Sequence, residues 1–244
     1  VMLQNSNFFQ VINIGAYDEL LGRQSMSFTP RTAVKIGPYI GWKFIFLGYA
    51  FDVSRPKSTG KMSEFSFSLY TNKIGGDIVY IKNSGNHKMR DVKGFKDIDR
   101  KAYRGTDFGG LSTYTTSINA YYIFNNRKFS YPAAFNQTNQ QKRSAGSFLL
   151  GLRFEHQKLN FDFSQLPSKL TTDSIMSKHL LLSSLDYQNF CINAGYAYNW
   201  VFAPNFVFSA SLTPSIGFKR LKGEKITSEL VFKDIRRINF DLVG

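Results

Sequence analysis

The sequence predicts an all-β fold, and in particular a transmembrane antiparallel up-and-down β-barrel. The first observation is strict alternation. From Phe206 to Phe218, large apolar residues such as Phe208 and Leu212 occupy every second position, with small or polar residues such as Ser211 between them. A period of two places neighbouring side chains on opposite faces of a sheet. A strand of this length exceeds the usual strand of a soluble domain and can cross a bilayer when it is tilted.

Composition and loop lengths are the other two observations. The chain of 244 residues contains 24 Phe and 13 Tyr. Its mean hydropathy is nevertheless slightly negative, and it has no run of the roughly 18 apolar residues that a membrane-spanning helix needs. A soluble β-sandwich would also alternate, because one face of each strand is buried, but strand length and aromatic content favour the barrel. Short turns alternate with long loops, as is typical of outer-membrane barrels.

We expect ten strands in this chain, each with apolar residues at alternate positions. The first, around Phe9 to Ile14, is defined least clearly. In chain order, the apolar positions of the next four are Val34, Ile36, Pro38 and Ile40; Ile45, Leu47, Tyr49, Phe51 and Val53; Phe65, Phe67 and Leu69; and Ile74, Ile78 and Tyr80. Those of the last five are Ile118, Tyr122 and Phe124; Phe148, Leu150, Leu152 and Phe154; Phe190, Ile192, Tyr196, Tyr198 and Trp200; Phe206, Phe208, Leu212, Ile216 and Phe218; and Ile238, Phe240 and Leu242.

The connections predict how the strands are oriented. Short turns are expected at 41–42, 71–73 and 203–205, and long loops at 16–31, 54–62, 83–112, 158–185 and 220–235. All short turns fall at one end if 125–145 is a single elaborate connection there. A hairpin turn at Asn125–Asn126 followed by a separate strand would move the later turns to the other end. In the first arrangement an interfacial aromatic girdle forms at the turn end, and it consists of Trp42, Phe124, Trp200, Phe202 and Phe206.

We expect residues 1–244 to form one narrow barrel domain. The chain begins without the features of a secretory signal, and its Asp-Leu-Val-Gly end differs from the terminal aromatic that bacterial barrels usually carry. The expectation is therefore that the signal peptide and a C-terminal hairpin are lacking, and that the intact protein has twelve strands.

Three segments resemble a known protein family. They are FNNRKFSYPAAFNQTNQQKRSAGSFLLG at 124–151, SLTPSIGF at 211–218 and GKMSEFSFSLYTNKIGGDIVY at 60–80. In order and spacing they are similar to an uncharacterised family of Bacteroidota outer-membrane proteins known only as a domain of unknown function. Pro132 stands where that family has a basic residue. The resemblance implies a signal-bearing barrel in the outer membrane and implies no activity.

Charged residues on the inward positions predict a closed interior. Opposite charges can compensate one another across a narrow lumen, whereas unpaired buried charges are costly. We expect paired charges, with an ion pathway as the alternative. The predicted lumen charge cluster consists of Lys35, Asp52, Glu64, Asp77, Arg153, Glu155, Arg237 and Asp241.

The connection at 125–145 is the candidate for a periplasmic turn or plug. Pro132 interrupts a regular ladder, and a run of uncharged amides follows that can satisfy its own hydrogen bonds at the lumen mouth. A docking site or plug and a merely large turn both stay open. The residues concerned are Tyr131, Pro132, Phe135, Asn136, Gln137, Gln140 and Gln141.

The net charge of +14 is concentrated in loops. A basic outer loop would contact lipopolysaccharide phosphates or an acidic partner, and solvated loop charge is the alternative. The loop contains Lys88, Arg90, Lys93, Lys96, Arg100, Lys101 and Arg104, and a second basic group contains Arg220, Lys222, Lys225, Lys233, Arg236 and Arg237. Because the aromatic residues lie on strand faces and the charges lie in loops, we expect no nucleic-acid binding.

No enzymatic chemistry is predicted. The lone Cys191 cannot form an internal disulfide and is interpreted as a small filler, and three histidines without partner cysteines give no zinc spacing. His156 lies at a strand position predicted to face lipid, near the outer rim of the barrel. No Ser or Asn partner can be assigned to it, so the sequence does not support a catalytic triad. We expect no catalytic residue, cofactor or metal.

These observations lead to a hypothesis for function. We expect a non-enzymatic structural or accessory barrel of the bacterial outer membrane that contacts the bilayer and lipopolysaccharide and binds another outer-membrane or periplasmic protein. A narrow porin or small-solute transporter is the alternative, and a lipid-modifying enzyme is third.

Overall fold

The computed structural model describes residues 2–3, 11–54, 61–96, 98–135, 139–171, 175–180, 182–225 and 232–243. Within these residues the fold is mostly β, and all strands lie in two antiparallel sheets. The helical elements are short: α1 (Arg100–Tyr103), α2 (Tyr131–Phe135) and the 3-10 helices η1 (Phe163–Gln165), η2 (Ser168–Leu170) and η3 (Lys178–Leu180).

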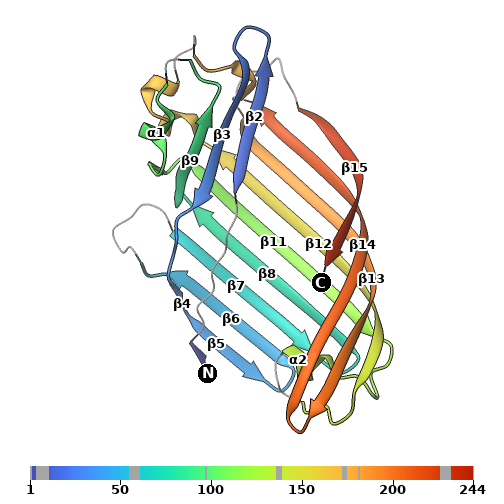
Figure 1. Cartoon of the computed structure of the whole chain (residues 1–244). Helices are drawn as coiled ribbons and strands as arrows, with labels where there is room; N and C mark the ends of the chain where they lie inside the picture. The colour runs from blue at the N-terminus through green and yellow to red at the C-terminus, as the bar shows by residue number, and fades with distance from the viewer. Residues whose placement is uncertain are drawn as a thin grey trace.

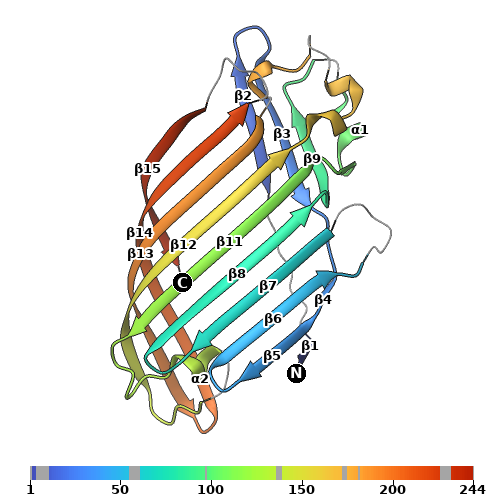
Figure 2. The same ribbon diagram turned by 180° about the vertical axis from the view of Figure 1, so that it is seen from behind.

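The large sheet follows an up-and-down order, because from its second strand onward each strand pairs with the next one in that sheet. Its spatial order is β1 (Met2–Leu3), β5 (Pro38–Trp42), β6 (Ile45–Asp52), β7 (Lys61–Tyr70), β8 (Ile74–Ser84), β11 (Leu111–Ile123), β12 (Ala145–Phe161), β13 (Leu182–Ala203), β14 (Phe206–Lys225) and β15 (Phe232–Val243). β4 (Lys35–Ile36) also pairs with β6. The sheet is strongly curved, with its concave face toward the viewer in Figure 1 and its convex face shown in Figure 2.

The short turns lie at one end of this sheet, here called the turn end (Figure 1). Lys43 and Asn205 have positive φ values of 53° and 67° at two of these turns. The first turn is at 43–44, slightly later than predicted, because β5 continues to Trp42. Residues 124–144 connect β11 to β12 at the same end, and these two strands pair directly. A hairpin at Asn125–Asn126 followed by a separate strand is therefore not what the chain forms.

A second sheet lies at the opposite end, where only loops were predicted (Figure 1). Its order is β10 (Asp107–Phe108), β9 (His87–Lys93), β3 (Gly22–Pro30) and β2 (Ile12–Asp18). The predictions of loops at 16–31 and 83–112 are therefore wrong. The predicted first strand at 9–14 is wrong in its partner, since its described part belongs to β2 in this sheet. In β9 the alternation is hidden because a register shift opposite Ser27 and Phe28 inserts one extra residue between the partners Met89 and Asp91.

A hydrophobic core joins the second sheet to the concave face of the large one. Phe28 of β3 is fully buried, and its ring centroid lies 5.0 Å from that of Phe108 and 5.3 Å from that of Phe161 on β12. Leu111 and Leu159 complete the core from the large sheet. The stretch 158–185 is also more ordered than the predicted polar loop, since β12 runs to Phe161 and the 3-10 helices bury apolar residues in the same core. This end of the concave face is therefore filled by side chains.

Candidate functional site

The two faces of the large sheet differ in the side chains that they expose and bury. On the convex face large apolar side chains are exposed, among them Leu152, Phe190 and Ile216. On the concave face polar side chains are buried, and Asn189 and Asn199 are each 1 % exposed. Along β12, β13 and β14 the exposed and buried positions follow the predicted alternation. Any proposed function must therefore account for an exposed apolar face and a buried polar face.

The residues predicted as an aromatic girdle all lie near the turn end and are exposed. Their exposed fractions are 65 % for Trp42, 58 % for Phe124, 55 % for Trp200, 56 % for Phe202 and 61 % for Phe206. Phe202 stacks loosely between Trp200 and Phe206, with ring centroids 5.6 and 5.9 Å apart. Lys43 Nζ lies 4.9 Å from the centre of the Trp42 ring, and the Phe124 ring lies 5.1 Å from that of Tyr122, but each girdle ring keeps more than half of its surface exposed.

The predicted lumen charge cluster is separated into local groups. Lys35 is 1 % exposed and forms an ion pair with Glu64. The Asp77 carboxylate accepts a hydrogen bond from the Tyr70 hydroxyl. Asp52 lies nearer the rim and accepts a 3.4 Å hydrogen bond from the Asn86 amide. Lys35 on β4 reaches Glu64 on β7 across the intervening β6, and Asp52 on β6 reaches Asn86 beyond the end of β8, so the predicted charges form separate local contacts rather than one cluster.

The remaining residues of the predicted lumen charge cluster contact a near neighbour, are exposed, or have side chains outside the described residues. Arg153 Nε is 3.7 Å from Glu155 Oε1, and Asn189 donates to the second oxygen of Glu155 over 3.3 Å. Arg237 on β15 is exposed. The side chain of Asp241 lies outside the described residues. Arg153 and Glu155 also line a cavity of about 380 Å³ on the concave face, whose other walls include Asn119, Tyr121 and Asn193.

The connection 124–144 folds inward against the concave face. Phe129 is buried with Ile123 and Leu149, and the ring of Tyr131 lies 4.8 Å from that of Tyr121. Burial raises the pKa of the Tyr131 hydroxyl, and the nearby Asp77 charge raises it further. This inward-folded segment therefore occupies part of the concave face at the turn end, as the hydrophobic core does at the other end.

Buried amides hold the segment in place. The Asn199 amide donates to the Ser130 carbonyl over 2.9 Å and to Gln141 Oε1 over 2.7 Å, and the same Gln141 oxygen accepts from the Ser130 N–H over 2.9 Å. Of the other predicted plug residues, Pro132 is buried and Gln140 donates to Asn205 Oδ1 over 2.5 Å. Asn136, Gln137 and the side chain of Phe135 lie outside the described residues.

An open bay of about 800 Å³ lies on the solvent side of this segment and is here called the turn-end bay. Amides and cations line it, and the Asn139 amide donates a 2.8 Å hydrogen bond to Asn72 Oδ1. Four cations face it, namely Arg127, Lys128, Lys142 and Arg143, and no carboxylate residue contributes to its described lining. Sequence reasoning found the amides and missed these cations, although they flank the same block.

The predicted basic outer loop is in fact part of the second sheet and α1. Lys88, Arg90 and Lys93 lie on β9, Arg100 and Lys101 lie on α1, and Arg104 is the residue that caps its C-terminus. Lys96 lies between these two elements and is exposed. With α1, these residues border a cavity of about 650 Å³ lined by Arg90, Asp91, Ile98, Asp99, Arg100, Lys101 and Arg104.

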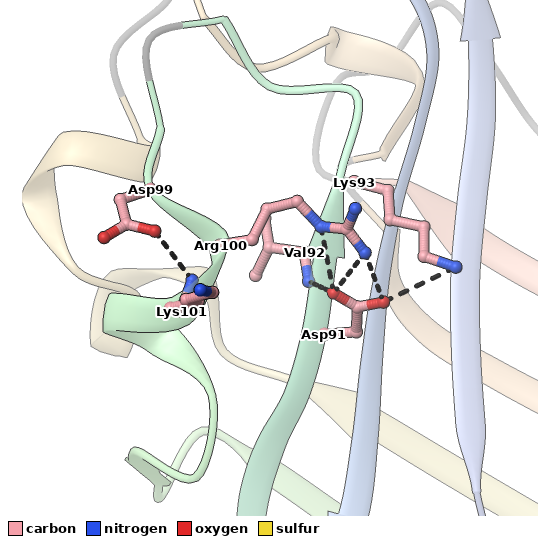
Figure 3. Close-up of polar contacts among 6 residues, drawn as sticks. All are labelled: Asp91, Val92, Lys93, Asp99, Arg100 and Lys101. Carbon is pink, nitrogen blue, oxygen red and sulfur yellow. Dashed lines mark hydrogen bonds and ion pairs between the residues drawn. The ribbon is translucent and has the colours of Figure 1, made fainter.

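Asp91 holds α1 against β9 (Figure 3). Arg100 Nη2 donates to its two oxygens over 3.0 and 2.9 Å, and Lys93 Nζ lies 3.4 Å away. Desolvation opposes ionisation of Asp91, but the hydrogen bonds and charge of Arg100, the Val92 N–H and Lys93 together keep its pKa below the usual value. The Asp99 side chain caps α1 by accepting from the Lys101 N–H over 2.9 Å.

Metal or nucleophilic chemistry would depend on the histidines, the cysteine and the carboxylates of the described residues. No group of three or more His, Cys, Asp or Glu is placed there to hold a metal ion. His156 Nε2 lies 3.1 and 3.2 Å from the Asp186 oxygens on the convex face, a partner that sequence reasoning did not assign. Buried Cys191 donates weakly to Asn189 Oδ1 over 3.4 Å. His87 is buried, and desolvation lowers its pKa to about 4, although hydrogen bonding of its ring to the Leu111 backbone opposes this.

Comparison with known proteins gives the family. Residues 1–240 match the family described as a domain of unknown function, DUF4421. The chain belongs to the DUF4421 family. The resemblance to a domain of unknown function over most of the chain is thus confirmed, whereas the outer-membrane and Bacteroidota parts of that resemblance stay predictions.

The other comparisons add no relative to this DUF4421 chain. No curated protein matches it, and no solved structure matches it. Among the described residues, none of the helices has both the length and the apolar character needed to span a membrane.

Proposed function

We propose that this DUF4421 protein is an integral outer-membrane β-barrel that works as a non-conducting structural or accessory subunit and binds another envelope protein. The observation that carries the proposal is the reversed distribution of side chains. A face of exposed Leu, Ile and Phe opposite a face of buried Asn, Ser and Gly is suited to acyl chains on the outside and a filled tube inside. A continuous apolar surface of this extent in water would drive aggregation.

The filled ends support a closed interior rather than a pore. One end of the concave face contains the core around Phe28 and Phe161, and the other contains Phe129 and Tyr131. Between them Arg153 is placed beside Glu155, and Lys35 is paired with Glu64. A solute that crossed the tube would have to displace both hydrophobic clusters.

The turn-end bay is the proposed binding site for the partner. Its four cations and its amides offer donors to carboxylates and to peptide carbonyls. In outer-membrane barrels the short turns face the periplasm, so the partner would be a periplasmic protein, or the periplasmic part of another membrane protein, that presents an acidic segment.

Extraction of the protein from envelopes in mild detergent tests this proposal. Wild-type protein is expected to elute with a stoichiometric partner, and the Lys128→Glu/Lys142→Glu variant is expected to lose it. The matched control is Lys88→Glu/Lys101→Glu at the opposite end, which should keep the partner. Recovery of wild-type protein alone contradicts the subunit role.

A narrow porin is the second candidate, favoured by the polar walls of the 380 Å³ cavity. Planar-bilayer recordings of the purified protein separate the two roles. Single-channel conductance would support the porin and overturn the closed interior, whereas a silent bilayer with reconstituted protein would remove the porin.

A further inference from the structure

The convex face carries a cationic patch directly beyond its apolar residues, at the end away from the turns. The patch is defined by Lys82, Tyr114, His156, Lys158, Asp186, Gln188, Arg220 and Lys222. These residues lie on β8, β11, β12, β13 and β14 and share the outward parity of the exposed apolar side chains. The patch is therefore built into the strands rather than into loops.

Strand register places the change from apolar to cationic at one level across neighbouring strands. An apolar row runs through mutually paired residues, namely Ile78, Ile118, Phe154, Phe190 and Phe218. Four residues further along each strand, the row of paired residues is Lys82, Tyr114, Lys158, Asp186 and Lys222. Between the two rows, His156 and Gln188 pair with each other and Gln188 pairs with Arg220.

The lysines of the patch are accessible and regularly spaced. Lys82, Lys158 and Lys222 are exposed, and they lie on alternate strands, so neighbours are separated by two strand spacings, roughly 10 Å. The single carboxylate, Asp186, is engaged by His156 and by Gln188, whose amide donates to it over 3.2 Å. Within the described residues no ion pair joins the three lysines to a carboxylate, and Lys82 rests 5.7 Å from the centre of the Tyr114 ring.

The inward side chains change character at the same level. On β12 the inward positions are Gly151, Arg153, Glu155 and Gln157 up to this level, and buried Leu159 and Phe161 beyond it. Beyond Phe154 the outward side therefore becomes cationic where the inward side becomes apolar. A strand end that is merely exposed to solvent requires neither of these two changes in residue type. A lipid boundary on the outward side and a hydrophobic core on the inward side account for both.

We infer that the cationic patch binds the phosphates of lipopolysaccharide while the adjoining apolar rows contact its acyl chains. This inference rests on the proposed outer-membrane location. The argument is charge complementarity joined to continuity, since an amphiphile with an anionic head needs cations and an apolar surface side by side. The other end of the same face has exposed Trp and Phe instead, so the two ends are chemically different.

Binding of bis-phosphorylated lipid A to purified protein in neutral detergent micelles tests the inference. The Lys158→Gln/Lys222→Gln variant is expected to bind about tenfold more weakly or worse, because each lost charge-assisted contact removes up to a factor of ten. The control variant Lys43→Gln/Lys73→Gln removes the same charge at the turn end and should bind as wild type. Lys158→Arg/Lys222→Arg should retain binding, and wild-type affinity should fall as salt is raised.

The outcomes distinguish this inference from the proposal on which it rests. Insertion is measured separately by quenching of Trp42 and Trp200 fluorescence with brominated lipids. If all variants insert but lipid A binding is unchanged in Lys158→Gln/Lys222→Gln, the patch is not the site and the membrane location stands. Equal binding of phosphatidylglycerol and lipid A overturns the assignment to lipopolysaccharide. Absence of quenching in the wild type overturns the proposed function itself.

Discussion

The side-chain amide of Asn199 lies 2.7 Å from Gln141 Oε1 and joins residues 58 positions apart in the chain. Asn199 is on β13 and 1 % exposed, and Gln141 belongs to the connection that covers the turn end. This contact, with the two bonds at Ser130, fixes an irregular segment onto a regular sheet.

Replacement of Gln141 by Ala should release the inward-folded segment. The Ser130 N–H loses its acceptor and the Asn199 amide loses one of its two, and each unsatisfied buried donor costs about 1–3 kcal/mol. Trypsin cleavage after Arg127 and Lys128 should become faster by tenfold or more. Gln140→Ala is the control, because its bond to Asn205 is exposed. Equal cleavage rates in both variants would contradict the anchoring role of Gln141.

The pair formed by Lys35 and Glu64 should be intolerant of single changes. Glu64→Gln leaves the Lys35 ammonium, 1 % exposed, without its charged partner, and breaking a buried pair in this way typically costs about 3–5 kcal/mol. The melting temperature in detergent should fall markedly. The double variant Lys35→Met/Glu64→Leu should recover most of the loss, and a melting temperature as low as in Glu64→Gln would show that the charges themselves are required.

Acid should loosen the second sheet through His87. Its pKa is about 4 in the fold, against 6.5 as the ordinary value, so the unfolded state binds the proton more readily and stability rises with pH between these two values. The full contribution, roughly 3 kcal/mol, is present above pH 6.5 and is lost as pH falls toward 4. Amide exchange of β3 and β9, corrected for intrinsic rates, should accelerate over this window.

The His87→Gln variant provides the control for that measurement, because it lacks the titrating ring and its exchange should be flat over the same pH range. Asp91 acts at lower pH: its depressed pKa makes its contribution full above the ordinary carboxylate value of 3.8 and lost only below it. Wild-type exchange that is unchanged from pH 7 to 4.5 would rule out the His87 effect.

A cation on the apolar row should impair membrane insertion. Phe190→Arg on the convex face replaces the last apolar residue before the cationic patch, so it is expected to cost less than the roughly 2–4 kcal/mol of an Arg at the bilayer midplane but more than the near-zero cost at the interface. Gln188→Arg, one step along the same face of β13, enters the cationic patch and should insert as wild type. Folding into lipid vesicles, followed by heat-modifiable gel migration, measures both. Equal folding of the two variants would contradict the position of the lipid boundary between these residues.

Sequence reasoning predicted the strands whose two faces differ in a constant way. From Phe206 to Phe218 apolar residues point outward throughout, and the structure contains that strand with the predicted faces. The strands were predicted too short, because beyond Phe218 the outward residues are Arg220 and Lys222 and the inward residues are Lys219 and Leu221. The outward positions thus change from apolar to charged along a single strand. If apolar residues are expected on the outward side throughout, the charged part of the strand is interpreted as a loop.

The second sheet and the candidate sites depended on contacts that no local pattern contains. β9 pairs with β3 about 65 residues earlier, and its bulge spaces Met89 and Val92 three apart, which masks the period of two. The predicted lumen charges were identified as residues but not as pairs, because register decides that Lys35 meets Glu64. The amides of 124–144 were found by composition, but their partner Asn199 was not, since it is one of several alternating Asn residues on β13.

The hydrophobic core at the end opposite the turns draws on three stretches that are distant in the chain, residues 12–30, 87–111 and 159–180. Because contacts between segments so far apart in the sequence form slowly, we expect this core to be completed late in folding, after the hairpins of the large sheet have paired.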